Sequence, residues 1–299
     1  MIDRRKFALG AGAMALVGCA KAEVSAAGEA GAAARLAALE APGARLGAYV
    51  LDTGSGRGFG WRSRERFGMC STFKLSLAAY CLREGDAGRL ALGEVLRFGK
   101  ADLLPNSPVT TANLAQGGMT IAALAEATQI TSDNAAANLL LKRIGGPAAI
   151  TRFWRELGDP HARLDRYEMA MNRVAPGEEH DTVTPEGIAR SVAKFALGDV
   201  LAPTTRARLN DWMARTQTGL KRIRAALPPG WRGGDKTGTG SFSDLATKIN
   251  DIAVLTPPGG RAPLVVAAFY EAPLPFGDVR DADQAVLARV GEVAVQWAS

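Results

Sequence analysis

The chain has 299 residues, of which 47% are hydrophobic and 22% are charged, a composition typical of a soluble globular protein with a sizeable core. Its formal net charge of +6 is dispersed along the sequence, and no Lys/Arg block is interleaved with aromatic residues, so no nucleic-acid partner is expected. The three cysteines and two histidines form no cluster with metal-ligand spacing, so neither a metal nor another cofactor is expected. The scarcity of histidine also disfavours a Ser-His-Asp triad.

Residues 1–22 have the pattern of an export signal. Arg4 and Arg5 form a twin-arginine pair, and the apolar stretch that follows is too short to span a bilayer. Leu16-Val17-Gly18-Cys19 has the form of a lipobox, in which Cys19 would carry a lipid anchor, whereas Ala20-Lys21-Ala22 fits ordinary cleavage. Both alternatives stay open. The signal pattern predicts an exported protein, periplasmic or secreted, and no later stretch is long and apolar enough for a membrane span.

Strand signals lie near both ends of the chain, and helix signals dominate between them. The expected helices are 28–40, a run from 71, then 120–128, 133–144, 147–157, 185–197, 203–216 and 281–297, and the expected strands are 45–51, 59–62, 233–237, 250–255 and 264–272. This order predicts an α/β fold of the α+β type, with an antiparallel sheet from the terminal segments packed against a helical lobe of about residues 70–216. We expect one catalytic domain, residues 23–299, with its site between sheet and lobe.

Ser71-Thr72-Phe73-Lys74 begins a run of mostly apolar or small residues that predicts a buried helix. A spacing of three residues places the side chains of Ser71 and Lys74 one turn apart, where they can form a hydrogen bond. A buried ammonium has a lowered pKa and can act as a base, so Ser71 is a candidate nucleophile. Taken alone, these residues favour the alternative of a helix N-cap followed by a surface lysine, because Ser-x-x-Lys is common by chance.

Two further motifs carry the same chemistry. In Ser132-Asp133-Asn134, the hydroxyl of Ser132 can relay a proton and the amide of Asn134 can hold a carbonyl, although a plain N-cap is the alternative. In the second motif, Lys236 and Thr237 offer a charge and a hydroxyl to a substrate carboxylate. Gly238 allows a close backbone approach, and the Thr239 N–H can form an oxyanion hole with that of Ser71. Its alternative is an ordinary edge strand.

Taken together and in this order, the three motifs resemble those of the class A serine β-lactamases, over nearly the whole chain after residue 22. A fourth stretch makes the resemblance specific, because Arg163 to Glu168, Asn172 and Asp181 to Pro185 are similar to that family's omega loop. The resemblance implies that Glu168 and Asn172 hold the water that hydrolyses an acyl-enzyme on Ser71. It also implies an ion pair between Arg166 and Asp181 that closes the loop.

The sequence departs from the family pattern at several positions. Asn106 stands where relatives often have an aromatic residue at the mouth of the site. Relatives that hydrolyse carbapenems often pair the cysteine before the nucleophile with a second one, but Cys70 has only Gly240 opposite it. The connection from Ser241 to Ile249 is longer than usual, and we expect it to border the site. For the substrate carboxylate, Arg222 is the preferred arginine; Arg224, Arg280 and a merely solvated basic face are alternatives.

The expected function is β-lactam hydrolysis by a monomer, with a small-molecule β-lactam as the only partner. A D-alanyl-D-alanine peptidase or penicillin-binding protein shares the first three motifs but lacks the counterpart of Glu168 with Asn172. A serine glutaminase has the same general fold without the complete set. A non-catalytic β-lactam sensor would stay acylated. Whether Lys74 or Glu168 takes the proton of Ser71 stays open.

Overall fold

The computed structural model describes residues 27–299. The expected export signal, with its alternatives at Cys19 and after Ala22, lies outside the described residues. Within residues 27–299, no helix combines the length and the hydropathy needed to cross a membrane.

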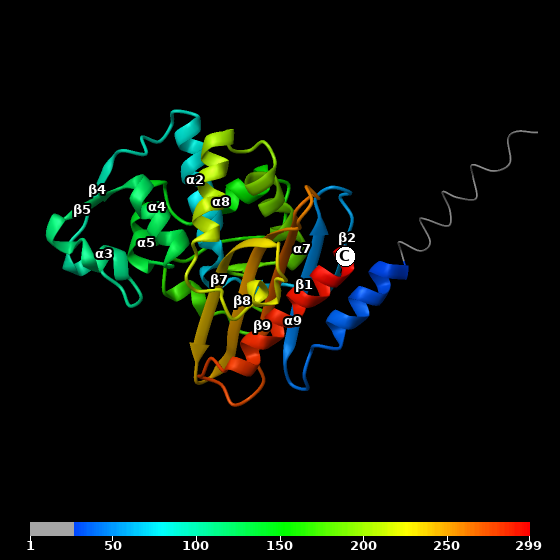
Figure 1. Ribbon diagram of the computed structural model, residues 1–299. Helices are drawn as coiled ribbons and strands as arrows, with labels where there is room; N and C mark the ends of the chain where they lie inside the picture. Colours follow the sequence, from blue (N-terminus) through cyan, green and yellow to red (C-terminus); the bar gives the residue numbers. More distant parts are fainter. Residues whose placement is uncertain (1–26) are drawn as a thin grey trace, which may run out of the picture.

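One antiparallel sheet forms the side of the molecule that holds both ends of the described chain (Figure 1). Its strand order is β2-β1-β9-β8-β7, so the last strand of the sequence lies in the middle of the sheet. The strands are β1 (Arg45–Asp52), β2 (Gly58–Trp61), β7 (Arg232–Phe242), β8 (Leu245–Thr256) and β9 (Leu264–Glu271). Two short pairs lie outside it, β3 (Phe67–Gly68) with β6 (Thr182–Val183), and β4 (Val95–Arg97) with β5 (Gly118–Thr120).

Helices cover both faces of this sheet. A helix over residues 27–37 and α9 (Asp281–Ala298) lie on one face. The lobe on the other side contains α2 (Phe73–Asp86), α3 (Pro108–Ala112), α4 (Ile121–Ile130), α5 (Asn134–Arg143), α6 (Ala148–Glu156), α7 (Pro185–Val192) and α8 (Pro203–Ala214). Short helical turns complete the chain: η1 (Cys70–Thr72), η2 (Lys100–Asp102), η3 (Leu114–Gln116), η4 (Ala170–Asn172), η5 (Ala193–Leu197) and η6 (Ile223–Ala226).

The two faces of the sheet bury two separate apolar clusters. Successive side chains of a strand point to opposite faces, and β9 follows this rule: Val266 and Ala268 join the cluster with α9, whereas Val265, Ala267 and Phe269 join the cluster of the lobe. Within the lobe, α2 is surrounded by α4, α5, α6 and α8, and most of its side chains are buried. The predicted fold class, an antiparallel sheet packed against a helical lobe, is confirmed.

The expectation of a long connection from Ser241 to Ile249 is wrong. Strand β7 continues to Phe242 and β8 begins at Leu245, so only two residues join them. The strands stay paired as far as Phe242 and Leu245, with a register shift between Gly240 and Phe242. Small polar residues predict a loop, but pairing with the neighbouring strand satisfies their backbone groups. The extra residues therefore lengthen the hairpin.

Candidate active site

Ser71 lies in η1, which leads directly into α2, and its hydroxyl faces the side chain one turn further along the helix. The Lys74 ammonium donates a hydrogen bond of 3.0 Å to Ser71 Oγ. The side chain of Lys74 is fully buried. The spacing of the motif thus places a serine and a buried amine in direct contact, as expected for three residues on a helix.

Lys74 is held by three residues from two other parts of the chain. Its ammonium donates to the Ser132 carbonyl at 2.9 Å and to Asn134 Oδ1 at 2.5 Å, and it lies 3.0 Å from Glu168 Oε1. Burial lowers the pKa of Lys74, and the adjacent Glu168 carboxylate opposes this effect. A lowered pKa increases the fraction of neutral amine at a given pH, and the neutral amine is the form that can accept a proton.

Glu168 reaches the nucleophile from the segment between α6 and α7. Ser71 Oγ donates to Glu168 Oε1 at 3.2 Å, and Asn172 Nδ2 donates to Glu168 Oε2 at 2.7 Å. Each carboxylate oxygen is therefore oriented by a different partner. Glu168 is also buried, so it is held beside the serine rather than exposed as a surface carboxylate.

Asn138 is a site residue that the sequence analysis missed. Its Nδ2 donates to the Glu168 carbonyl at 2.8 Å, and its Oδ1 accepts from the Glu168 N–H at 2.9 Å. One amide side chain thus satisfies both backbone groups of Glu168. Asn138 follows Asn134 by four residues on α5, the spacing that places two side chains on one helix face, and this repeat was the available signal.

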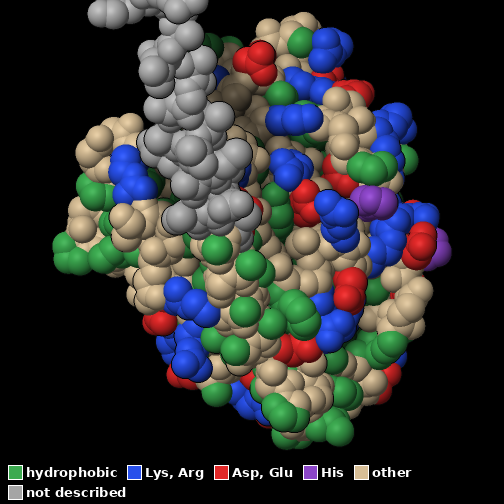
Figure 2. All heavy atoms as spheres, turned by 90° about the vertical axis from the view of Figure 1, so that its right-hand side faces the viewer, with side chains coloured by type: hydrophobic (Ala, Val, Ile, Leu, Met, Phe, Trp, Pro, Cys, Tyr) green, Lys and Arg blue, Asp and Glu red, His purple; other side chains and the backbone are tan. Residues whose placement is uncertain are grey.

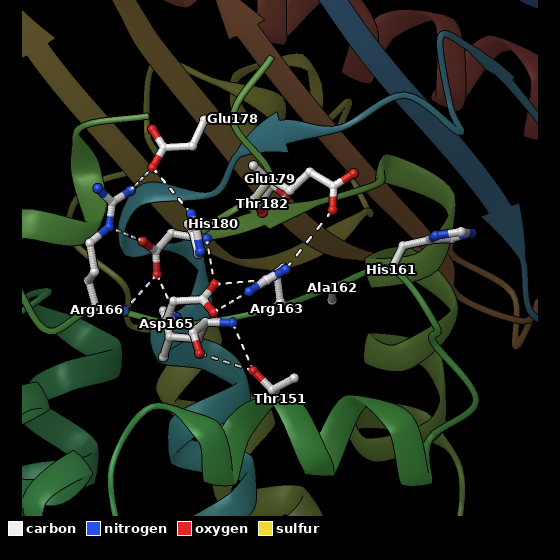
Figure 3. A network of polar contacts seen from close by, with 12 residues as sticks. Thr151, His161, Ala162, Arg163, Asp165, Arg166, Glu178, Glu179, His180 and Thr182 are labelled. Carbon is white, nitrogen blue, oxygen red and sulfur yellow. Dashed lines mark hydrogen bonds and ion pairs between the residues drawn. The ribbon is translucent and has the colours of Figure 1, made fainter. Parts of the chain in front are cut away.

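The base of the segment that carries Glu168 is closed by a charged network (Figure 3). Arg166 Nε lies 2.5 Å from Asp181 Oδ2, and Asp181 Oδ1 accepts the N–H groups of Asp165 and Arg166 at 2.8 and 3.0 Å. Arg166 also contacts Glu178 at 3.1 Å. The structure thus places the two residues of the expected ion pair in direct contact, with the carboxylate fully buried.

The hydroxyl of Ser132 lies between two buried ammonium groups. Lys236 Nζ is 3.1 Å and Lys74 Nζ is 3.3 Å from Ser132 Oγ. The backbone of Ser132 has a φ of 60°, a conformation that residues other than glycine rarely adopt. Burial, reinforced by the charge of Lys74, lowers the pKa of Lys236 to about 7. A chain of proton-carrying groups therefore runs from Lys74 through Ser132 to Lys236.

Strand β7 forms the wall opposite the helical lobe. Gly238 lies against the turn that carries the nucleophile, because a Cβ at this position would come within 2.7 Å of the Met69 carbonyl. Thr237 Oγ1 is 2.6 Å from Thr218 Oγ1, and Thr239 is exposed. The close approach that only glycine allows brings the edge of the sheet next to Ser71.

Of the three candidate arginines, Arg222 is the one that contacts Gly238 and Thr239 of this wall. Its guanidinium donates to the Gly238 carbonyl at 3.1 Å and to Thr239 Oγ1 at 2.8 Å. Arg224 instead pairs with Asp235 at 2.7 Å, and Arg280 pairs with Asp283 at the start of α9. Arg222 is almost completely buried, so its interpretation as part of a solvated basic face is wrong.

The mouth of the site on the lobe side is built by the loop before α3. Asn134 Nδ2 donates to the Pro105 carbonyl at 2.8 Å, and the Asn134 N–H donates to the Asn106 carbonyl at 3.1 Å. The side chain of Asn106 in turn donates to the Ser132 carbonyl at 3.2 Å. In place of an aromatic face, this position supplies a polar link that holds Ser132.

Comparison with known proteins agrees with this geometry. Residues 31–298 match a family model described as the β-lactamase enzyme family. β-Lactamase FAR-1 from Nocardia farcinica is 44% identical over 263 residues, which cover 88% of this chain and 81% of that protein. The chain belongs to the class A serine β-lactamases. The carbapenem-hydrolysing β-lactamase KPC from Klebsiella oxytoca is 45% identical over 77% of each protein.

Solved class A β-lactamases share the fold as well as the sequence. An ancestral class A β-lactamase superposes with a TM-score of 0.82 at 47% identity, covering 89% of this chain and 99% of the other. A β-lactamase from Xanthomonas campestris gives a TM-score of 0.84 at 41% identity, covering 91% and 99%. The predicted family and enzyme class are confirmed, and this class A β-lactamase is a hydrolase.

Proposed function

We propose that hydrolysis proceeds through an acyl-enzyme on Ser71. Ser71 Oγ attacks the lactam carbonyl carbon while its proton passes to a neighbouring base. The C–N bond then breaks, and the departing nitrogen receives a proton through the Ser132 hydroxyl. The contact that carries this proposal is the 3.0 Å hydrogen bond between Lys74 Nζ and Ser71 Oγ. The backbone N–H groups of Ser71 and Thr239 are the proposed oxyanion hole.

Either of two groups has the reach to accept the proton of Ser71. Lys74 Nζ is 3.0 Å and Glu168 Oε1 is 3.2 Å from Ser71 Oγ, both within the range for direct transfer. The lowered pKa of Lys74 favours the amine. Replacing each residue in turn distinguishes the two candidates. Loss of the residue that takes the Ser71 proton slows formation of the adduct, whereas loss of the other residue does not.

In the second half of the proposed cycle, a water hydrolyses the ester. Glu168 acts as general base, and Asn172 helps to position the water. Water adds to the acyl carbon, its proton moves to Glu168, and the Ser71 hydroxyl is regenerated as the acid leaves. The orientation of both Glu168 oxygens, at 3.2 and 2.7 Å from their partners, supports this role.

The substrate carboxylate is proposed to bind at β7, where Lys236, Thr237 and Thr239 present a charge and hydroxyls. Arg222 is proposed to position this site through the hydrogen bond that its guanidinium donates to Thr239 Oγ1. Asn134 is the proposed partner of the substrate's amide side chain, since the residue already lies at the mouth of the site.

The proposed setting is outside the cytoplasm, and the proposed oligomeric state is a monomer. The twin-arginine pattern of residues 1–22 supports export. Intact-mass analysis of the processed protein would distinguish a lipid anchor at Cys19 from cleavage after Ala22.

The test pairs turnover with mass analysis. The purified domain should hydrolyse benzylpenicillin and a chromogenic cephalosporin many times per molecule, with only a transient adduct of substrate mass on Ser71. The variant Ser71→Ala should form no adduct. One equivalent of stable adduct without turnover would contradict the role of Glu168 and would point to a binding protein or a peptidase.

A further inference from the structure

A second cavity lies behind the segment that carries Glu168 and Asn172. It has a volume of about 460 Å³ and is bounded by residues 174–179 on one side and by strands of the sheet on the other. Its lining includes Gly68, Lys248 and Glu271, and none of Ser71, Lys74, Ser132 or Glu168. The cavity is therefore separate from the catalytic groups, although it shares a wall with the segment that positions them.

Lys248 of β8 lines this cavity with its charge unmatched. The residue is only 3% exposed. Throughout residues 27–299, its ammonium has neither an ion pair nor a hydrogen bond with the protein. Gly68 makes the room for its side chain, because a Cβ at Gly68 would lie 2.9 Å from Lys248 Cε. The stem of Lys248 is therefore buried, while its ammonium faces the cavity without a protein partner and is free to bind an external group there.

The carboxylates around the cavity are already engaged. Glu271 lies opposite Lys248 in the sheet, but the Glu271 carboxylate forms an ion pair with Arg45 at 3.1 Å. Arg45 also forms an ion pair with Glu65 at 3.1 Å. Figure 3 shows the ion pairs that Glu178 and Glu179, in the segment 174–179, form with arginines. Engagement of these acids leaves the ammonium of Lys248 as the free donor.

Those two glutamates face arginines rather than Lys248. Glu178 contacts Arg166 at 3.1 Å and also accepts a hydrogen bond of 3.0 Å from the Ala175 N–H. Glu179 contacts Arg66 at 3.7 Å and Arg163 at 4.0 Å. A shift of either acid toward Lys248 would break an existing ion pair. An external anion satisfies the ammonium without that loss.

We propose that this cavity binds a small oxyanion through Lys248. The ammonium offers three donors, which suits a phosphate or carboxylate group whose several oxygens all accept. The volume admits a small hydrated anion. A bound oxyanion would connect β8 to the residues that follow Asn172, and so would tie the wall of the active site to the sheet from behind.

The decisive measurement is thermal unfolding in inorganic phosphate against chloride at matched ionic strength, for wild type and Lys248→Met. Methionine is unbranched and close to the lysine stem in shape. Phosphate stabilises folded proteins generally by exclusion, and this effect is common to both variants. Specific binding adds about 1.4 kcal/mol per tenfold phosphate above Kd, or about 3 °C in Tm, in the wild type only. An equal response of both variants would overturn the proposal.

Three further measurements complete the test. Without phosphate, Lys248→Met should melt no lower than wild type, because methionine keeps the buried apolar stem and the ammonium has no protein partner to lose; a lower Tm would show that the ammonium already has a partner and would refute the site. Titration calorimetry of wild type with phosphate should show saturable binding that Lys248→Arg retains. Hydrogen exchange of residues 174–179 should slow in phosphate in the wild type alone, and no slowing there would refute the proposed connection to this segment.

Discussion

Replacing Gly240 by cysteine should crosslink the sheet to the turn that carries the nucleophile. A Cβ at Gly240 would lie 3.0 Å from Cys70 Sγ, and across a disulfide each Cβ is about 3 Å from the opposite sulfur. Gly240 does not have a positive φ, so a side chain costs little backbone strain. The sulfur of the new cysteine therefore falls within bonding range of the existing one.

The stabilisation follows from the length of chain that the bond would close. Residues 70 and 240 enclose about 170 residues, and loop-closure entropy then gives about 5 kcal/mol as an upper value. For a protein of this size that corresponds to about 10 °C in Tm. Because burial raises the pKa of Cys70 to about 12, oxidation is expected during folding rather than in the folded protein.

Calorimetry of Gly240→Cys, folded under oxidising conditions, checks this prediction. Intact mass should show loss of two hydrogens, and reduction should remove the gain in Tm. Gly240→Ser is the matched control, since it adds a similar side chain that cannot crosslink. An oxidised variant that melts no higher than Gly240→Ser would refute the reasoning.

Three further predictions concern the catalytic groups. Glu168→Gln should lower kcat by about 10²–10⁴-fold, the range for loss of a general base, and mass spectrometry should find an accumulated adduct; rapid turnover would contradict the assignment. Asn138→Ala leaves two backbone groups of Glu168 unpaired, so the free energy of unfolding should fall by about 1–3 kcal/mol, and kcat should fall as well. An unchanged Tm with full kcat would show that Asn138 does not position Glu168. Because the pKa of Lys236 is lowered to about 7, its charge is lost as pH rises through that value, and kcat/KM for benzylpenicillin should decline on the alkaline side. Lys236→Arg stays charged and should shift this decline to higher pH; identical pH profiles would argue against titration of Lys236.

The predicted nucleophile and Lys74 could be located from the sequence because their chemistry is local, whereas the role of Glu168, 97 residues away, came from the resemblance of its stretch to the omega loop of a family. Ser71 and Lys74 are one helical turn apart, so the pattern itself contains their contact. Asn138 was missed because its partner lies 30 residues away, and its spacing of four residues from Asn134 places it on the same helix face without naming that partner. Lys248 escaped for the same reason, because its lack of a partner becomes visible only when the whole surroundings are present.

The fold was predictable where side-chain pattern and backbone pairing agree. Strand β9 is a continuous apolar run and was expected within a residue of its bounds. The hairpin of β7 and β8 was misjudged because Gly240, Ser241 and Ser243 have loop composition, yet their strands pair almost to the turn. Composition reports what a residue tolerates, whereas the neighbouring strand decides what its backbone does.

The central position of β9 also has a consequence for how the protein is made. Strands β1 and β2 are synthesised first, but β1 meets its second neighbour only when residues 264–271 exist. Strand β9, which joins the two parts of the sheet, is synthesised after all the other strands. Until then β1 and β8 each present an open edge, the kind of surface that invites mispairing between chains. Both of these edges can therefore be covered only after residues 264–271 have been synthesised.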